Sequence, residues 1–243
     1  MGDMQRVQQI CDEFERLCQT PFNDRLRDYK DAGGKIVGVL YNQVAEELVL
    51  AAGLLPVRLR AVGSKGDELA DARFTQVNCS EVRCLYDAAA RGTFDFIDGL
   101  VATNACDHVR KLYENWADVL KPPYSHLVCF PKRKGDDLQV AHLAGELAEF
   151  KASLEEHFGV QITDEALRAA IELTNEIRAL QLKLDDMRAE SANPPITGAQ
   201  ALAVHMAGTC MPRQDYKALL SELVDVCEGV EGLPGQKRLV VYG

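Results

Sequence analysis

The sequence predicts an α/β protein in which a doubly wound parallel sheet is followed by a helical domain. Two observations lead to this prediction. Short apolar runs alternate with helix-forming stretches in the first half of the chain, which is the order of a parallel sheet with crossover helices. From about residue 136 to residue 230 only helical patterns follow. With 243 residues, 47% of them hydrophobic, the chain can bury a sizeable core.

The first segment, residues 1–34, is expected to be an introductory helical arm. Val7, Ile10 and Phe14 recur at helical spacing, and the pattern continues far enough to predict helix over residues 3–30. The sequence DAGG then ends the helix, because glycine is the usual residue beyond a helix end.

Residues 35–135 are expected to form the α/β domain. Its strands are short, apolar and rich in β-branched residues, and its helices end at glycines such as Gly53 and Gly92. Ser80 is the expected N-cap of the second helix. The expected strands are 35–40, 55–62, 96–103 and 125–130, and the expected helices are 44–53, 81–91 and 107–120.

Residues 136–233 are expected to form the helical domain. Thr163 caps its clearest helix, the sequence ANPPITG at 192–198 breaks that helix, and the last helix is entered at Pro212. The final stretch, QKRLVVYG at 236–243, resembles the first strand of a second α/β domain. Because no helix follows it, we expect this second domain to be truncated at the carboxyl terminus.

Composition excludes several classes of function. The 27 Lys and Arg residues face 37 Asp and Glu residues, so the net charge of −10 opposes a nucleic-acid partner. The chain begins without an apolar leader and has no apolar run long enough to cross a membrane, so a cytoplasmic protein is expected. It has neither a dinucleotide-binding glycine fingerprint nor a P-loop.

Two of the eight cysteines fall just before the start of an expected helix. Cys106 lies between the strand at 96–103 and the next helix, and Cys79 immediately precedes Ser80. Open α/β sheets bind ligands at this carboxyl edge, and a helix N-terminus stabilises a thiolate. The two thiolates could therefore share a metal. The alternative is that both are inert thiols, which is the expected state of Cys84 and Cys129.

Three further groups are weaker candidates. Glu46 and Glu47 could act in acid–base chemistry or could simply favour the dipole of their helix. His108 could face the same crevice as Cys106, as a proton donor or hydrogen-bond partner, or could be a solvated surface residue. The basic residues 132–134 could meet a phosphate group or form a solvated loop.

Three stretches give the chain a family resemblance. They are GVLYNQVAEELVLAAGLLPVRLR, NCSEVRCLYDAAARGTFDFIDGLVATNACDHVRKLYENW and LEEHFGVQITDEALRAAIELTNEIRALQLKLDDMR. From about residue 35 to its end, the chain resembles the 2-hydroxyacyl-CoA dehydratase and benzoyl-CoA reductase family of anaerobic iron-sulfur enzymes. The resemblance implies a 4Fe-4S cluster held by cysteines, with Cys79 and Cys106 as the ligands that carry over to this sequence.

One departure from the family pattern concerns the remaining ligands. Many members have a cysteine and then a proline before the paired glutamates, where this chain has Tyr41 and Ala45. A further family cysteine follows the first strand of the second α/β domain, just beyond Gly243. A cluster of this kind is usually held by about four thiolates. Cys84, Cys129 or an oxygen ligand could be recruited to supplement the two cysteine ligands that this sequence retains.

The resemblance also implies a reaction and its partners. An ATP-hydrolysing iron-sulfur activator passes an electron to the cluster, and a 2-hydroxyacyl-CoA then loses water through a ketyl radical. The implied partners are a sister subunit of the same family, the activator and the acyl-CoA substrate. Glu46 and His108 are the candidate catalytic residues. The alternatives are a benzoyl-CoA reductase subunit and a cluster-free paralogue that serves as a structural or acyl-CoA-binding partner.

Overall fold

The computed structural model describes residues 2–41, 43–133 and 135–230 together with residues 232, 234 and 237. The chain divides into two compact units, one formed by Gln19–Ile171 and the other by Met1–Cys18 together with Glu172–Gly243. Residues of the expected amino-terminal arm fall in both units. Apart from residue 237, the strand expected at 236–243 lies outside the described residues. Among those that are described, no helix is long and apolar enough to cross a lipid bilayer.

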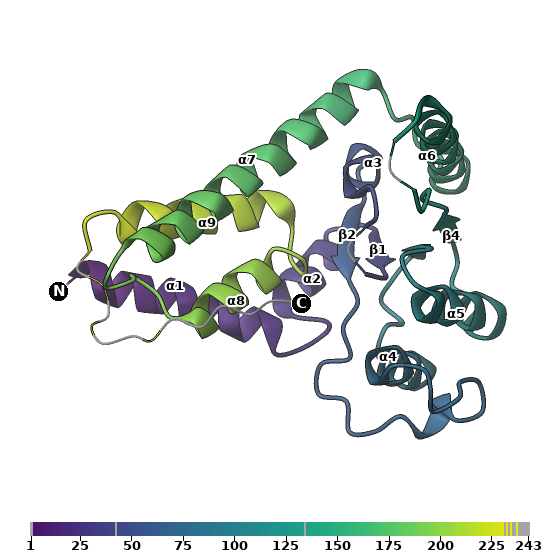
Figure 1. Cartoon of the computed structure of the whole chain (residues 1–243), viewed down its shortest axis with the longest axis horizontal. Helices are drawn as coiled ribbons and strands as arrows, with labels where there is room; N and C mark the ends of the chain where they lie inside the picture. The colour runs from purple at the N-terminus through teal and green to yellow at the C-terminus, as the bar shows by residue number, and fades with distance from the viewer. Residues whose placement is uncertain are drawn as a thin grey trace. The chain divides into compact units, whose positions relative to one another are not determined.

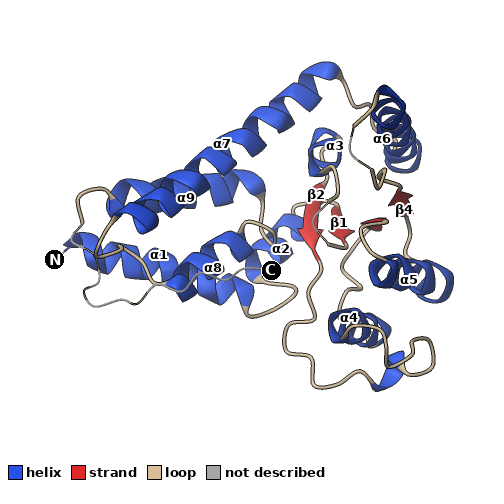
Figure 2. Cartoon of the chain, viewed as in Figure 1, coloured by secondary structure: helices blue, strands red, loops and turns tan. Residues whose placement is uncertain are grey.

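The unit Gln19–Ile171 is built on a parallel sheet of four strands, drawn as red arrows in Figure 2. The strand order is β2-β1-β3-β4, and all three pairings are parallel. Val37 pairs with Pro56 on one side and with Gly99 on the other. A proline is tolerated in β2 because this strand lies at the sheet edge. The strands are β1 (Ile36–Val39), β2 (Leu55–Arg58), β3 (Gly99–Thr103) and β4 (Ser125–Val128).

Helices lie on both faces of this sheet, as expected for a doubly wound fold. Figure 1 shows α3 and α6 on one face and α4 and α5 on the other. The chain leaves β1 toward β2 and later returns to form β3 on the opposite side of β1, so the switch point lies between β1 and β3. The helices are α3 (Glu46–Ala51), α4 (Ser80–Ala90), α5 (Asp107–Asn115) and α6 (Asp137–Phe158).

Several local predictions are confirmed and others are corrected. Gly53 and Gly92 have φ angles of +74° and +83°, which explains why glycine ends these helices. The prediction that Ser80 caps α4 is wrong, because the backbone of Cys79 is extended and its carbonyl accepts the N–H of Arg83. Cys79 is therefore the N-cap. One α-helix is expected to reach residue 120. The α-helical part, α5, ends at Asn115, and a short π-helical segment, Trp116–Leu120, follows it directly.

The prediction of one helix over residues 3–30 is also wrong. Two helices form instead, α1 (Gly2–Cys18) and α2 (Asp24–Asp31). Pro21 lies in the gap and has no N–H to continue a helix. Asn23 then starts α2, because its side chain accepts the N–H of Leu26 at 3.0 Å.

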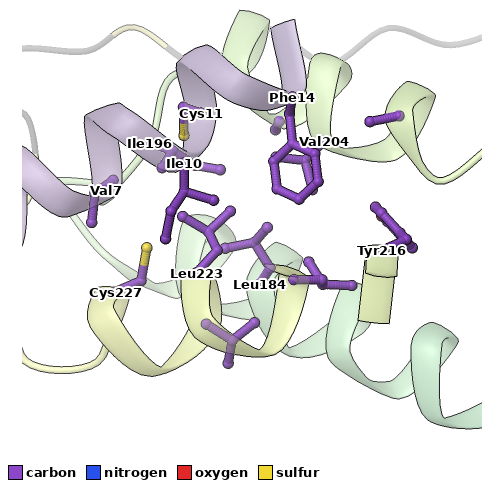
Figure 3. Packing of buried hydrophobic residues seen from close by; sticks show 14 of the residues in the cluster. Val7, Ile10, Cys11, Phe14, Leu184, Ile196, Val204, Tyr216, Leu223 and Cys227 are labelled. Carbon is purple, nitrogen blue, oxygen red and sulfur yellow. The ribbon is translucent and has the colours of Figure 1, made fainter. Parts of the chain in front are cut away.

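The second unit is a helical bundle with its own apolar core. Phe14 of α1, Leu184 of α7 and Tyr216 of α9 belong to one buried cluster, and Figure 3 shows these side chains gathered between the helices. Thr163 accepts the N–H of Ala166 and so caps α7 as expected. The remaining helices are α7 (Asp164–Glu190), which passes from the first unit into the second, α8 (Gly198–Ala207) and α9 (Arg213–Cys227).

Candidate functional site

A hollow of about 300 Å³ opens at the carboxyl edge of the sheet, beside the switch point. Tyr41 follows the end of β1, and Arg58 is the last residue of β2. Cys79 and Cys106 line the same hollow, and aliphatic side chains of α4 and α5 complete its wall. Ligands of open α/β sheets bind at this position. The two cysteines that the sequence singled out are therefore brought to one cavity.

Both cysteines occupy the N-cap position of a helix. Cys79 precedes α4 and its side chain makes no capping hydrogen bond, whereas the sulfur of Cys106 accepts the N–H of Val109 at 3.4 Å. Both residues are exposed free thiols. Each sulfur therefore lies beside the N–H groups of a first helical turn, and cysteine sulfur is a donor that soft metals and iron-sulfur clusters prefer.

His108 joins the two helix starts. It is the second residue of α5, and its Nδ1 accepts the backbone N–H of Cys79 at a distance of 3.1 Å. Because a ring nitrogen that accepts a hydrogen bond carries no hydrogen, this contact places the proton of the neutral imidazole on Nε2. The sequence suggested a histidine near Cys106, but its contact is with the backbone of the other cysteine.

The loop that carries Cys106 is tied to the segment that follows β4. Asn104 donates from Nδ2 to the carbonyl of Phe130 at 3.0 Å and accepts the Phe130 N–H on Oδ1 at 2.9 Å. The ammonium of Lys132 donates to the carbonyls of Asn104 and Ala105. Of the basic residues 132–134, Lys132 thus binds backbone oxygens beside the site. The sequence analysis did not identify Asn104 as a residue that supports the site. Its position as a polar residue directly after a buried strand was the signal that could have indicated this role.

A buried arginine orders the long loop that precedes Cys79. Arg83 of α4 is 7% exposed and pairs with the carboxylates of Asp67 at 2.5 Å and Asp71 at 2.6 Å. Hydrogen bonds to these two carboxylates raise the pKa of Arg83, so the guanidinium stays charged. It also donates to the carbonyl of Phe74 at 3.4 Å. No local pattern in the sequence indicates this anchor, because its partners are 12 and 16 residues distant.

Two residues of the hollow have unusual environments. Tyr41 has a φ of +70°, which is a strained angle for a bulky side chain, and it is 45% exposed. Strain of this kind gathers at functional sites. Arg58 has a buried Nε without a hydrogen-bond partner among the described residues. Glu81 also lines the hollow.

The other candidates lie away from this cavity. Glu46 is in the first turn of α3 and is not among the described residues that line the hollow. Cys84 and Cys129 are half-buried and are likewise absent from its wall. Burial and the nearby carboxylate of Glu146 raise the pKa of Cys129. These surroundings are typical of a thiol held in its neutral form.

A second hollow, of about 400 Å³, lies beside the loop that begins at Gly63. Three of the charged groups that line it pair with one another: Arg91 contacts Asp87 at 2.6 Å and Glu68 at 3.0 Å, and Lys65 adds a second positive charge. The hydrogen bond from Arg91 lowers the pKa of Asp87. This hollow therefore has its charges balanced and is a weaker candidate than the cavity that holds the two thiols.

The donor set of the first hollow can be compared with the cluster that the resemblance implies. Within the described ranges, no group of three or more His, Cys, Asp or Glu side chains is placed to hold a metal ion. Cys79 and Cys106 supply two sulfur donors, and Tyr41 and Glu81 are oxygen-bearing residues of the same lining. A 4Fe-4S cluster is usually held by about four thiolates. The described residues alone therefore provide an incomplete site for it.

Comparison with known proteins identifies several relatives. A benzoyl-CoA reductase subunit of Thauera aromatica is 29% identical over 217 residues, which cover 87% of this chain and 55% of the relative. The (R)-phenyllactyl-CoA dehydratase beta subunit of Clostridium sporogenes is 25% identical over 245 residues, covering 99% of this chain and 64% of the relative. The beta subunit of lactoyl-CoA dehydratase from Anaerotignum propionicum is 27% identical over 246 residues, with 99% and 63% covered.

The chain thus spans between 55% and 64% of the length of these three relatives. Residues 41–243 match the model of one protein family, described as 2-hydroxyglutaryl-CoA dehydratase, D-component. The match includes Tyr41, Cys79, Cys106 and every helix from α3 to α9. The chain therefore belongs to the family of the 2-hydroxyglutaryl-CoA dehydratase D-component.

Proposed function

We propose that the chain is part of a subunit of a 2-hydroxyacyl-CoA dehydratase, and that Cys79 and Cys106 bind its iron-sulfur cluster. The observation that carries the proposal is their position: two exposed thiols, each at a helix N-cap, line one hollow at the switch point of the sheet. The remaining donors would be Tyr41, Glu81 or residues elsewhere in the protein.

The proposed reaction is the elimination of water from a 2-hydroxyacyl-CoA. The relatives include dehydratases named for phenyllactyl-CoA and lactoyl-CoA, which supports a thioester substrate of this class. The cluster would supply one-electron chemistry, with the electron delivered by an ATP-dependent iron-sulfur activator and the thioester passing through a ketyl radical. A sister subunit of the same family would complete the enzyme.

This chain's own residues would hold the two thiols in place. Asn104 and Lys132 fix the loop before Cys106, and Arg83 fixes the loop before Cys79. The aliphatic wall of α4 and α5 would exclude water from the reacting group.

A second candidate function is reduction of benzoyl-CoA. It is favoured by the similarity to the benzoyl-CoA reductase subunit of Thauera aromatica, which is 29% identical to this chain. Both functions use a CoA thioester and low-potential electrons, so the same hollow suits either.

Iron analysis tests the proposed ligands. Protein purified without oxygen should contain iron and sulfide, and Cys79→Ala and Cys106→Ala should each lose most of both, because each removes a cluster ligand. Cys84→Ala is the matched control, since Cys84 lies on α4 outside the hollow and its loss should leave the iron content unchanged. Unchanged iron in both site variants would refute the ligand assignment, whereas absence of iron from the unchanged protein would favour the cluster-free paralogue.

The oxygen donor is tested separately. Tyr41→Phe removes the hydroxyl and keeps the ring, so it should lower the iron content if the phenol is a ligand, and Tyr41→Cys should restore it. Equal iron content in the unchanged protein and Tyr41→Phe would exclude the phenol from the donor set.

Activity distinguishes the two reactions. The protein, supplied with its sister subunit, an activator, ATP and a reductant, should convert a 2-hydroxyacyl-CoA to the enoyl-CoA. Reduction of benzoyl-CoA with no turnover of hydroxyacyl thioesters would identify the second candidate instead. Thioester binding without either reaction would contradict both enzymatic functions.

A further inference from the structure

One side chain joins the two halves of the thiol pair. His108 belongs to the first turn of α5, two residues after Cys106, yet its Nδ1 accepts the N–H of Cys79, which lies 29 residues earlier. The imidazole is half-buried between the two helix starts. The backbone of one cysteine is therefore held by the helix turn that begins with the other.

The same turn also orients the second thiol. The N–H of Val109, the residue after His108, donates to the sulfur of Cys106 at 3.4 Å. One turn of α5 thus carries Cys106 and holds its sulfur, while its histidine holds the amide of Cys79. Asn104 and Lys132 secure the chain just before this turn. The two cysteine positions are consequently coupled through α5.

This contact limits what His108 can do in chemistry. Its Nδ1 is occupied as an acceptor, so that nitrogen cannot deliver a proton to a ligand while the contact lasts. A residue that orients a metal ligand through a hydrogen bond usually affects metal affinity strongly even though it does not touch the metal. The contact suits a residue that fixes the geometry of other donors.

We propose that His108 is a positioning residue that sets the location of Cys79 relative to Cys106. The inference rests on the proposed role of the two thiols as a pair of metal donors, but not on the identity of the cluster. Loss of the acceptor would release the Cys79 amide and let the start of α4 move away from α5. The pair would then bind a shared soft metal less tightly.

Cadmium binding to the 243-residue chain tests this inference without iron or enzyme activity. Cd²⁺ alone is titrated and followed by thiolate-to-metal absorption. His108→Ala should weaken binding roughly tenfold, as is typical when a residue that supports a metal ligand is removed. His108→Asn should restore most of the affinity, because the amide oxygen can accept the Cys79 N–H from nearly the same place. The matched control is His142→Ala on the exposed start of α6, which should bind as the unchanged chain does.

A second measurement in metal-free protein separates positioning from direct ligation by the imidazole. The Cys79 amide should exchange its hydrogen faster in His108→Ala than in the unchanged chain or in His108→Asn, and nitrogen NMR should show Nδ1 without a proton. Unchanged exchange in His108→Ala, a proton on Nδ1, or equal loss of cadmium affinity in the alanine and asparagine variants would each overturn the inference. Absence of iron from the purified protein, with cadmium affinity still dependent on His108, would refute the cluster and support the positioning role.

Discussion

Asn104 is expected to stabilise the fold of the α/β unit as well as the site. Its side chain makes two hydrogen bonds to the backbone of Phe130, with lengths of 3.0 and 2.9 Å, and both are partly buried. Each bond contributes about 1 kcal/mol net, and loss of the amide also leaves the N–H and carbonyl of Phe130 without these partners. The variant Asn104→Ala should therefore lower the free energy of unfolding by about 2 kcal/mol.

Urea unfolding of the unchanged chain and the variant, followed by circular dichroism, measures this difference. The control is Asn115→Ala, because Asn115 makes one exposed hydrogen bond at 2.9 Å to the carbonyl of Lys111 in its own helix. That change should alter the free energy of unfolding by less than about 0.5 kcal/mol. A loss in Asn104→Ala no larger than in the control would show that the Phe130 backbone finds water instead, and the reasoning would be refuted.

Three other changes have defined outcomes. Thr103→Val should raise the free energy of unfolding by about 1 kcal/mol, because the Thr103 hydroxyl is buried and unpaired among the described residues; a decrease would reveal a partner for it. Burial acts to raise the pKa of Asp98, but hydrogen bonds, led by the one from Lys30, hold this pKa below its ordinary value. The ionised carboxylate therefore stabilises the fold at pH values above the ordinary pKa of an aspartate. Asp98→Asn should lower the free energy of unfolding at neutral pH, and the difference in this free energy between variant and unchanged chain should shrink as the pH falls through the native pKa of Asp98. A difference that grows on acidification would contradict the ion pairing of Asp98. Leu184→Ala should cost about 3 kcal/mol in urea unfolding, because Leu184 is 0% exposed in the helical core. Leu182→Ala on the same helix should change the free energy of unfolding little, since Leu182 is 63% exposed. Equal losses of stability in Leu182→Ala and Leu184→Ala would show that Leu184 does not lie in the core.

Much of the α/β order could be predicted because its signals are local. The strands β1 and β3 are fully buried, so they appear in the sequence as continuous apolar runs. Glycines with positive φ mark the ends of α3 and α4. The break between α1 and α2 was missed because the apolar spacing on its two sides is similar, and Pro21 and Asn23 decided the interruption.

By itself, the sequence determined the sheet-and-helix order, the placement of Cys106 between a strand and a helix, and the placement of Cys79 at a helix start. These features depend on the hydrophobic period and on turn residues within a few positions of one another. Tertiary structure decided that both thiols line one hollow and that His108 holds the amide of Cys79. It also decided that Arg83 anchors the loop before α4. Such contacts join residues far apart in the chain, and they exist only because the strand order β2-β1-β3-β4 opens a switch point where α4 and α5 begin side by side.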